Sequence, residues 1–125
     1  MIKLHTNHGV ITLKMFADKA PETVANFIQY VKDGHYDNTI FHRVISNFMI
    51  QGGGFDVNMK ELTTRDSIKN EANNGVSNKL GTVAMARTMD PHSASAQFLS
   101  TWMTTNFLTT AHRLHKVGAT LYLVK

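Results

Sequence analysis

Apolar and polar residues alternate at the start of the chain, which predicts two extended segments joined by a turn. Ile2 and Leu4 are separated by polar residues, and apolar, β-branched positions return from Val10 to Phe16. Between the two segments, Thr6-Asn7-His8-Gly9 supplies residue types that favour turns. We therefore expect a β-hairpin at the N-terminus.

A helical period follows the hairpin. Four apolar residues recur at the spacing i, i+3, i+4 and i+7, which places them on one face of a helix. They are Val24, Phe27, Ile28 and Val31. Pro21 suits the first turn of this helix, and Gly34 suits the position after its last turn. The sequence thus predicts one amphipathic helix between these two residues.

Short, mostly apolar runs follow the helix at Ile40–Ile45, Met49–Gln51 and Thr82–Ala86, and we expect each to form a strand. The polar stretch from Phe55 to Lys79 has no sustained period and predicts a long surface loop, a kind of loop that often carries function. Several strands with one helix favour a mainly β fold, either an antiparallel barrel or a sandwich.

Composition narrows the class of protein. The 125 residues, 42% hydrophobic and 18% charged, suit one globular domain. No apolar run is long enough to cross a membrane, and the N-terminus lacks the apolar core of a signal peptide. Because the chain has no cysteine, it has no disulfide and no thiolate chemistry. We expect a cytoplasmic protein that does not bind membranes.

The net charge of +4 hints at a nucleic-acid partner, but its distribution argues against one. Three basic residues and no acidic residue lie after Phe98, so the preceding part of the chain is nearly neutral. The seven histidines include no H-E-x-x-H motif, and we expect no metal. The run Gly52-Gly53-Gly54 lacks the Lys-Ser/Thr of a phosphate-binding loop and predicts a turn or a close approach of the backbone.

The stretch FHRVISNFMIQGGGF, from Phe41 to Phe55, carries the strongest chemical signal. Arg43 lies in an apolar run, although arginine is rarely buried without a partner. Two interpretations stay open from these residues alone. Arg43 either forms a structural salt bridge or is a fixed cation at the floor of a shallow apolar pocket.

This stretch resembles the signature of the cyclophilins, the peptidyl-prolyl cis-trans isomerases, and of their bacterial cytoplasmic type in particular. Further segments resemble the family in the same order: HTNHGVITLKMF, KAPETVANF, IKNEANNG, GTVAMART and HSASAQF. The resemblance covers residues 1–98. It implies a mainly β fold, the cyclophilin-like antiparallel β-barrel with a capping helix.

The resemblance also implies a function. The chain would isomerise X-Pro bonds and assist protein folding without a cofactor. Its partners would be proline-containing peptides, unfolded proteins and cyclosporin-type ligands, and the chain would be a monomer.

The resemblance assigns roles to eight residues. Arg43 matches the catalytic arginine, and Gln51 matches the glutamine that holds this arginine and the substrate carbonyl. Six positions match residues that bind substrate, and Leu99 occupies a seventh such position; the six are Phe48, Met49, Gln51, Ala86, Arg87 and Gln97. Phe48 and Met49 would form pocket walls, and the backbone of Ala86 and Arg87 would pair with the substrate. Leu99 stands where the family has a phenylalanine at the pocket floor.

The family pattern breaks after Phe98. We therefore divide the chain into a cyclophilin-like portion, residues 1–98, and a tail outside the family pattern, residues 99–125. The barrel should be incomplete at its C-terminus, with irregular structure after Phe98.

Codon structure suggests a cause for the break. Thr101-Trp102-Met103-Thr104 must be encoded ACN-TGG-ATG-ACN, and reading from the third base gives Val/Leu/Met-Asp-Asp. The same frame permits a cyclophilin-like continuation to Lys125. A one-base frameshift with truncation is one interpretation, and true divergence is the other. The product would then be an active isomerase, a catalytically impaired proline-peptide-binding module or a non-functional frameshifted product.

Overall fold

The chain folds into seven strands and one helix in the parts that the structure, a computed structural model, describes: residues 1–6, 9–46, 48–101 and 114–123. In chain order the elements are β1 (Ile2–Thr6), β2 (Gly9–Met15), α1 (Pro21–Lys32), β3 (Arg43–Ile45), β4 (Met49–Gly52), β5 (Thr82–Ala86), β6 (Phe98–Thr101) and β7 (Leu114–Leu123). The predicted hairpin, helix and three later strands are present, but the strand expected at Ile40–Ile45 forms only over Arg43–Ile45.

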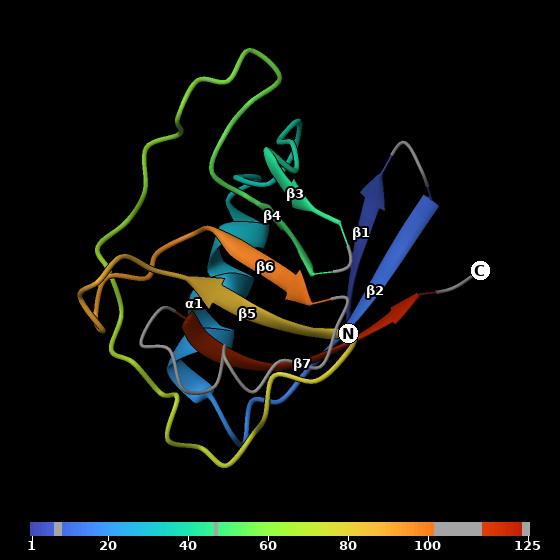
Figure 1. The fold of residues 1–125 in the computed structure, drawn as a ribbon. Helices are drawn as coiled ribbons and strands as arrows, with labels where there is room; N and C mark the ends of the chain where they lie inside the picture. The colour runs from blue at the N-terminus through green and yellow to red at the C-terminus, as the bar shows by residue number, and fades with distance from the viewer. Residues whose placement is uncertain (7–8, 47, 102–113, 124–125) are drawn as a thin grey trace.

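All seven strands belong to one antiparallel sheet, in the order β1-β2-β7-β5-β6-β4-β3. The sheet is strongly twisted, and α1 lies against one of its faces (Figure 1). Within the described ranges β1 and β3 are its two edges, so the sheet is not closed. This confirms the mainly β fold with a capping helix and an incomplete barrel.

The expectation of irregular structure after Phe98 is wrong for the described residues beyond it. β6 begins at Phe98, and the ten residues of β7 lie between β2 and β5. Ile11 pairs with Leu123 on one side of β7, and Thr82 pairs with Thr120 on the other. A strand with two neighbours gains a ladder along both edges, and such tertiary pairing outweighs a weak local pattern.

The helix α1 buries a face slightly different from the predicted one. Val24 and Phe27 are buried as expected, but Val31 is 39% exposed. Thr23 and Tyr30 are buried in its place. Both carry polar groups that form hydrogen bonds with the long loop, as described below. These bonds offset the free-energy cost of burying the polar groups. No helix in the described part of the chain has the length and hydropathy to span a bilayer.

The C-terminus of α1 is closed as the sequence predicts. Gly34 has a φ of +72°, and its N–H donates to the carbonyl of Val31 at 3.1 Å. The next N–H, from His35, donates to the carbonyl of Tyr30 at 3.1 Å. These two bonds satisfy the last carbonyl groups of the helix in a Schellman arrangement, for which glycine is the favoured residue.

The N-terminus of α1 is capped by a residue far away in sequence. Ala20 precedes the helix and offers no side-chain hydrogen bond. Instead the carboxylate of Glu71 accepts the backbone N–H groups of Glu22, at 3.2 Å, and Thr23, at 2.9 Å. It also accepts the Thr23 hydroxyl at 2.7 Å. A carboxylate at this position satisfies N–H groups that have no partner within the helix, and its negative charge complements the helix dipole.

The main core lies between α1 and the sheet. Its fully buried residues come from the helix, three strands and one loop: Leu13, Phe27, Val83, Met85, Ala94 and Phe98. The rings of Phe27 and Phe98 meet edge to face, with centroids 5.5 Å apart. Tyr36 stacks on Phe27 at 5.0 Å and donates its hydroxyl hydrogen to the carbonyl of Ala96. The helix and the loop before β6 are thereby fixed to each other.

The predicted long loop between β4 and β5 runs around the outside of the molecule (Figure 1). Three backbone N–H groups besides the Glu71 cap fasten it to the body. Arg65 donates to the Tyr30 hydroxyl at 2.7 Å, Ile68 to the carbonyl of Ala94 at 2.9 Å and Asn70 to His92 Nδ1 at 3.0 Å. The loop is irregular in backbone but held at several points along its length.

One buried hydroxyl in β6 lacks a partner. Ser100 is 2% exposed, and its Oγ makes no hydrogen bond within the described ranges. Because a buried unpaired hydroxyl has lost its water, Ser100→Ala is expected to raise the free energy of unfolding by about 1–2 kcal/mol. Chemical denaturation measures the change, and Ser77→Ala, at an exposed serine, is the control. A lower stability of Ser100→Ala would contradict this.

Candidate active site

Cross-strand register gathers the predicted site residues on one face of the sheet. Arg43 pairs with Gln51, Gln51 pairs with Leu99, and Leu99 pairs with Ala84. Directly opposed residues project to the same face, and side chains two positions apart on a strand share that face. Met49, two positions from Gln51, therefore lies on the same face as this row. The four residues of the row belong to β3, β4, β6 and β5, which lie side by side in this order from the edge of the sheet inward (Figure 1).

An apolar cluster occupies the middle of this face. Met49, Ala84 and Leu99 are buried together, and Phe48 packs against them from the turn between β3 and β4. Leu99 is 3% exposed, so this aliphatic side chain sits inside the cluster. The structure therefore brings together Phe48, Met49 and Leu99, which the resemblance assigned to one substrate pocket.

Arg43 lies exposed on the edge strand beside this cluster. The salt bridge formed within the described residues joins Arg65 to Asp33, and no carboxylate among them pairs with Arg43. The interpretation of Arg43 as a structural salt-bridge arginine is therefore wrong for the part of the chain that the structure describes. Its guanidinium is a charged donor group beside apolar surface, available to a ligand.

Two glutamine side chains connect the row to the end of β5. Gln51 donates from Nε2 to Oε1 of Gln97 at 2.9 Å. The backbone carbonyl of Gln97 accepts the N–H of Ala86 at 2.8 Å. Gln51 and Gln97 are both partly buried, so each amide fixes the orientation of the other. Gln51, Gln97 and Ala86 thus form one connected unit next to Arg43.

The glycine run after β4 gives the side chains around the site room to approach. A Cβ on Gly54 would lie 2.5 Å from three atoms of the Gln97 side chain, and one on Gly52 would lie 2.8 Å from the Phe41 ring. Gly53 has a φ of +88°, and a Cβ there would meet the Tyr36 ring at 2.8 Å. The prediction of a close backbone approach is confirmed, and the run allows Gln97 to lie over Gly54.

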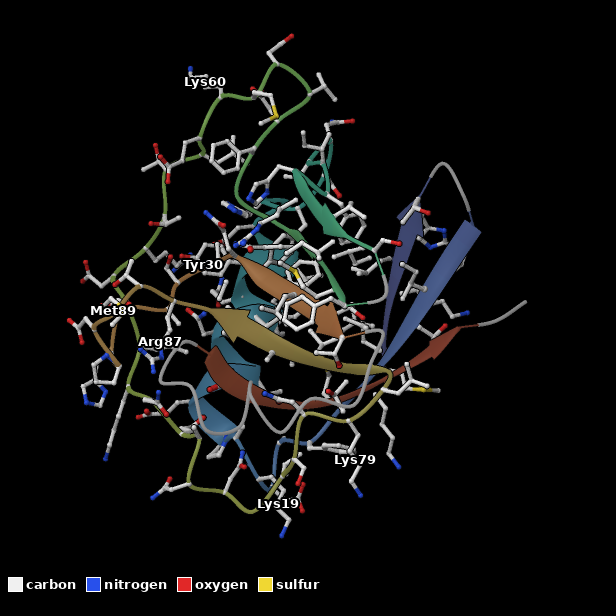
Figure 2. The ribbon with its side chains drawn as sticks, viewed as in Figure 1. Lys19, Tyr30, Lys60, Lys79, Arg87 and Met89 are labelled. Carbon is white, nitrogen blue, oxygen red and sulfur yellow. The ribbon has the colours of Figure 1, made fainter. Side chains whose placement is uncertain are left out.

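Arg87 is half-buried where the chain leaves β5, near the turn that contains Met89 (Figure 2). Its Nη1 donates to the carbonyl of Thr88 at 2.9 Å, and burial lowers the pKa of the guanidinium. Ser93 Oγ accepts the N–H and the hydroxyl of Thr88, at 2.9 and 2.8 Å. The Arg87 guanidinium is thus bonded to the neighbouring backbone. If this residue binds substrate, we expect it to do so through its own backbone groups.

His42 is a site neighbour that sequence reasoning missed, although it directly precedes Arg43. Its ring lies 4.4 Å from the ring of Phe55, measured between centroids. Its Nδ1 is buried and has no partner among the described residues. Burial, and then the charge of Arg43, lower the pKa of the imidazole below its usual value of 6.5.

The lowered pKa of His42 predicts a loss of stability in acid. The unfolded chain takes up a proton on this imidazole as the pH falls through 6.5, whereas the folded chain takes it up only at a lower pH. The free energy of unfolding therefore falls between these two values and is unaffected well above pH 6.5. Urea denaturation from pH 7.5 to 5 measures the slope, which His42→Gln should reduce. An equal slope in both proteins would exclude His42 as its source.

Comparison of the sequence with known protein families identifies the family of this chain. Residues 1–117 match the protein family described as "Cyclophilin type peptidyl-prolyl cis-trans isomerase/CLD". The chain belongs to the cyclophilin family. In this cyclophilin Arg43, Gln51 and the apolar cluster lie on one face of the sheet.

Among curated relatives, this cyclophilin is 60% identical over 108 residues to peptidyl-prolyl cis-trans isomerase B of Escherichia coli K12. The match covers 86% of the chain and 66% of the relative. It is 59% identical over 97 residues to peptidyl-prolyl cis-trans isomerase cyp18 of Streptomyces antibioticus, covering 78% of the chain and 58% of the relative. The cyclophilin thus spans less than two thirds of the length of either relative.

A solved structure supports the fold. The crystal structure of a Cryptosporidium parvum cyclophilin type peptidyl-prolyl cis-trans isomerase, in the presence of the dipeptide Ala-Pro, superposes with a TM-score of 0.80. The identity is 23%, and the match covers 98% of this chain and 78% of the other. At this identity the likeness establishes the architecture alone.

Proposed function

We propose that the chain catalyses the cis-trans isomerisation of X-Pro peptide bonds. The observation that carries this proposal is the exposed Arg43, which has no carboxylate partner among the described residues and lies in register with Gln51 and Leu99. A charged donor beside an apolar cluster suits a proline ring and its flanking amide. The curated relatives, which carry the name peptidyl-prolyl cis-trans isomerase, support the same activity.

The chemistry needs only a donor and a binding surface. Amide resonance sets a barrier of about 18–20 kcal/mol to rotation, while the cis form of an X-Pro bond lies only about 0.5–1 kcal/mol above the trans form. In the twisted transition state the proline nitrogen regains its lone pair. A donor aimed at this nitrogen stabilises the twisted state more than the planar ground state. Arg43 supplies such a donor and stays protonated while doing so.

The other residues would bind and orient the peptide. Phe48, Met49 and Leu99 would receive the proline ring in the apolar cluster. Gln51, held by Gln97, would keep Arg43 and the substrate carbonyl in place. The backbone of Ala86 and Arg87 would pair with the substrate chain.

The proposed partners are proline-containing peptides and unfolded proteins, with cyclosporin-type ligands as candidates for the same surface. The curated relatives, which carry the name peptidyl-prolyl cis-trans isomerase, support this class of ligand. We further propose that the chain acts as a monomer in the cytoplasm. Sedimentation of the purified chain with and without peptide tests the monomer.

Two-dimensional NMR exchange spectroscopy on an Ala-Pro peptide is the decisive experiment. The chain is expected to accelerate exchange between the cis and trans signals, in proportion to its concentration. Binding without acceleration would instead identify a catalytically impaired peptide-binding module. Neither binding nor acceleration would identify a non-functional product.

The division of the chain at Phe98 is a further proposal, which stands beside a family match that extends to residue 117. We propose that residues 99–125 arose from a one-base frameshift near codon 99. The unpaired buried hydroxyl of Ser100, directly after the boundary, supports this because a sheet core selects apolar residues. Sequencing the DNA from codon 97 to codon 103 tests it, and a frame with no cyclophilin-like alternative would refute it.

A further inference from the structure

The edge strand β3 carries an apolar side chain next to the proposed site that the function has not used. Ile45 is 38% exposed and lies two positions from Arg43, so the two side chains share one face of the sheet. Ile45 pairs directly with Met49 of the apolar cluster. The intervening residue, Val44, is 65% exposed and projects to the opposite face.

The distance from Ile45 to the cluster fits one or two residues of a peptide. Cβ atoms of directly opposed residues in an antiparallel pair lie about 4.5–5.5 Å apart. An extended peptide advances about 3.3 Å per residue. A peptide whose proline ring rests on Phe48 and Met49 therefore brings the side chain of a flanking residue to Ile45.

We propose that Ile45 is a specificity-determining residue, which favours substrates with an apolar side chain within two positions of the proline. This inference rests on the proposed isomerase function and names its substrate class. The occupant is the bound peptide itself, because Ile45 pairs directly with Met49 of the cluster, so the two side chains lie side by side on one face of the sheet. An apolar side chain that covers Ile45 removes apolar surface of both partners from water, whereas a polar one gains nothing there.

The test uses peptides in which leucine or asparagine, two side chains of similar size, occupies each of the two positions on either side of the proline. Binding is measured by NMR titration, and kcat/KM by exchange spectroscopy. At one of these flanking positions, the wild-type chain should bind and turn over the leucine peptide about threefold to tenfold better than the asparagine peptide. This ratio is the one expected for a shallow apolar contact. Ile45→Thr should reduce this ratio to near one.

The neighbouring residue provides a matched control. Val44→Thr makes a similar change on the same strand, at a more exposed side chain on the other face. It should leave the leucine preference unchanged, and both variants keep a β-branched residue suited to a strand. If the peptide instead added to the edge of β3 through its backbone, neither variant would change the ratio, and the proposal would be wrong.

A second variant guards against a failure of Ile45→Thr to fold. A third peptide set carries aspartate at the same positions. Ile45→Lys, at a position already in contact with water, should invert the preference from leucine to aspartate. Turnover of the asparagine peptides tests the isomerase function separately. Leucine preference in binding, lost in Ile45→Thr, upholds the inference even without turnover. Turnover with equal ratios in all variants overturns the inference alone, and absence of any binding overturns both.

Discussion

Replacing Arg43 with alanine is expected to lower kcat/KM for an Ala-Pro peptide by about 10²–10³, the usual effect of removing one preorganised donor. The guanidinium is exposed, has no carboxylate partner among the described residues and supports no packing of the core, so the variant should fold normally. The loss should therefore appear in turnover at unchanged thermal stability. Exchange spectroscopy and a thermal melt measure the two quantities.

Two further variants sharpen the role of Arg43. Arg43→Lys keeps the charge but lacks the planar fork of donors, so it should not restore activity. Lys60→Ala removes the same charge at the tip of the long loop, remote from β5 and β6 (Figure 2), and should leave turnover unchanged. Full activity of Arg43→Lys would show that charge alone suffices and would contradict the donor role.

Replacing Glu71 with alanine is expected to lower the free energy of unfolding by about 2–4 kcal/mol. The carboxylate accepts three hydrogen bonds at the start of α1, two of them from Thr23, which is fully buried. In the variant, the N–H and hydroxyl of Thr23 remain buried but lose this hydrogen-bond acceptor, which destabilises the folded state. The free energy of unfolding of a whole domain is only about 5–15 kcal/mol, so the expected loss is a large fraction of the total stability.

Urea denaturation at neutral pH measures this effect. Glu61→Ala removes the same charge from an exposed position of the same loop and should change stability by less than about 0.5 kcal/mol. Glu71→Gln keeps an acceptor without the charge and should fall between the two. Equal stabilities of Glu71→Ala and Glu61→Ala would show that α1 does not depend on the cap.

The capping of α1 shows what the sequence could and could not predict. Periodicity located the helix because Val24 and Phe27 face the core, and Pro21 and Gly34 marked its ends. The same pattern could not anticipate the burial of Tyr30. The hydroxyl of Tyr30 is satisfied by a backbone N–H of a loop 35 residues further along the chain, a contact that no local pattern encodes.

The candidate site likewise has a part that the sequence predicted and a part that it could not predict. The motif around Arg43 identified the residues that the register brings to one face, because β3 and β4 are neighbours in sequence and pair directly. The contact of Gln97 with Gln51 joins residues 46 positions apart and follows from the fold rather than from either segment. The strand β7 escaped prediction since it is defined by its neighbours, β2 and β5, more than by its own residues.

The central position of β7 has a consequence for how the chain folds during synthesis. β2 and β5 each border β7, so among the strands that the structure describes, the hairpin of β1 and β2 joins the rest of the sheet only through residues 114–123. The pairing of Ile11 with Leu123 brings together residues from almost opposite ends of the chain. Pairings this distant in sequence slow folding, because the entropy of a long loop is lost before any contact is gained. Until β7 has left the ribosome, one edge of β2 and one edge of β5 stay open, which makes the nascent chain a candidate client for chaperones that shield unpaired strands.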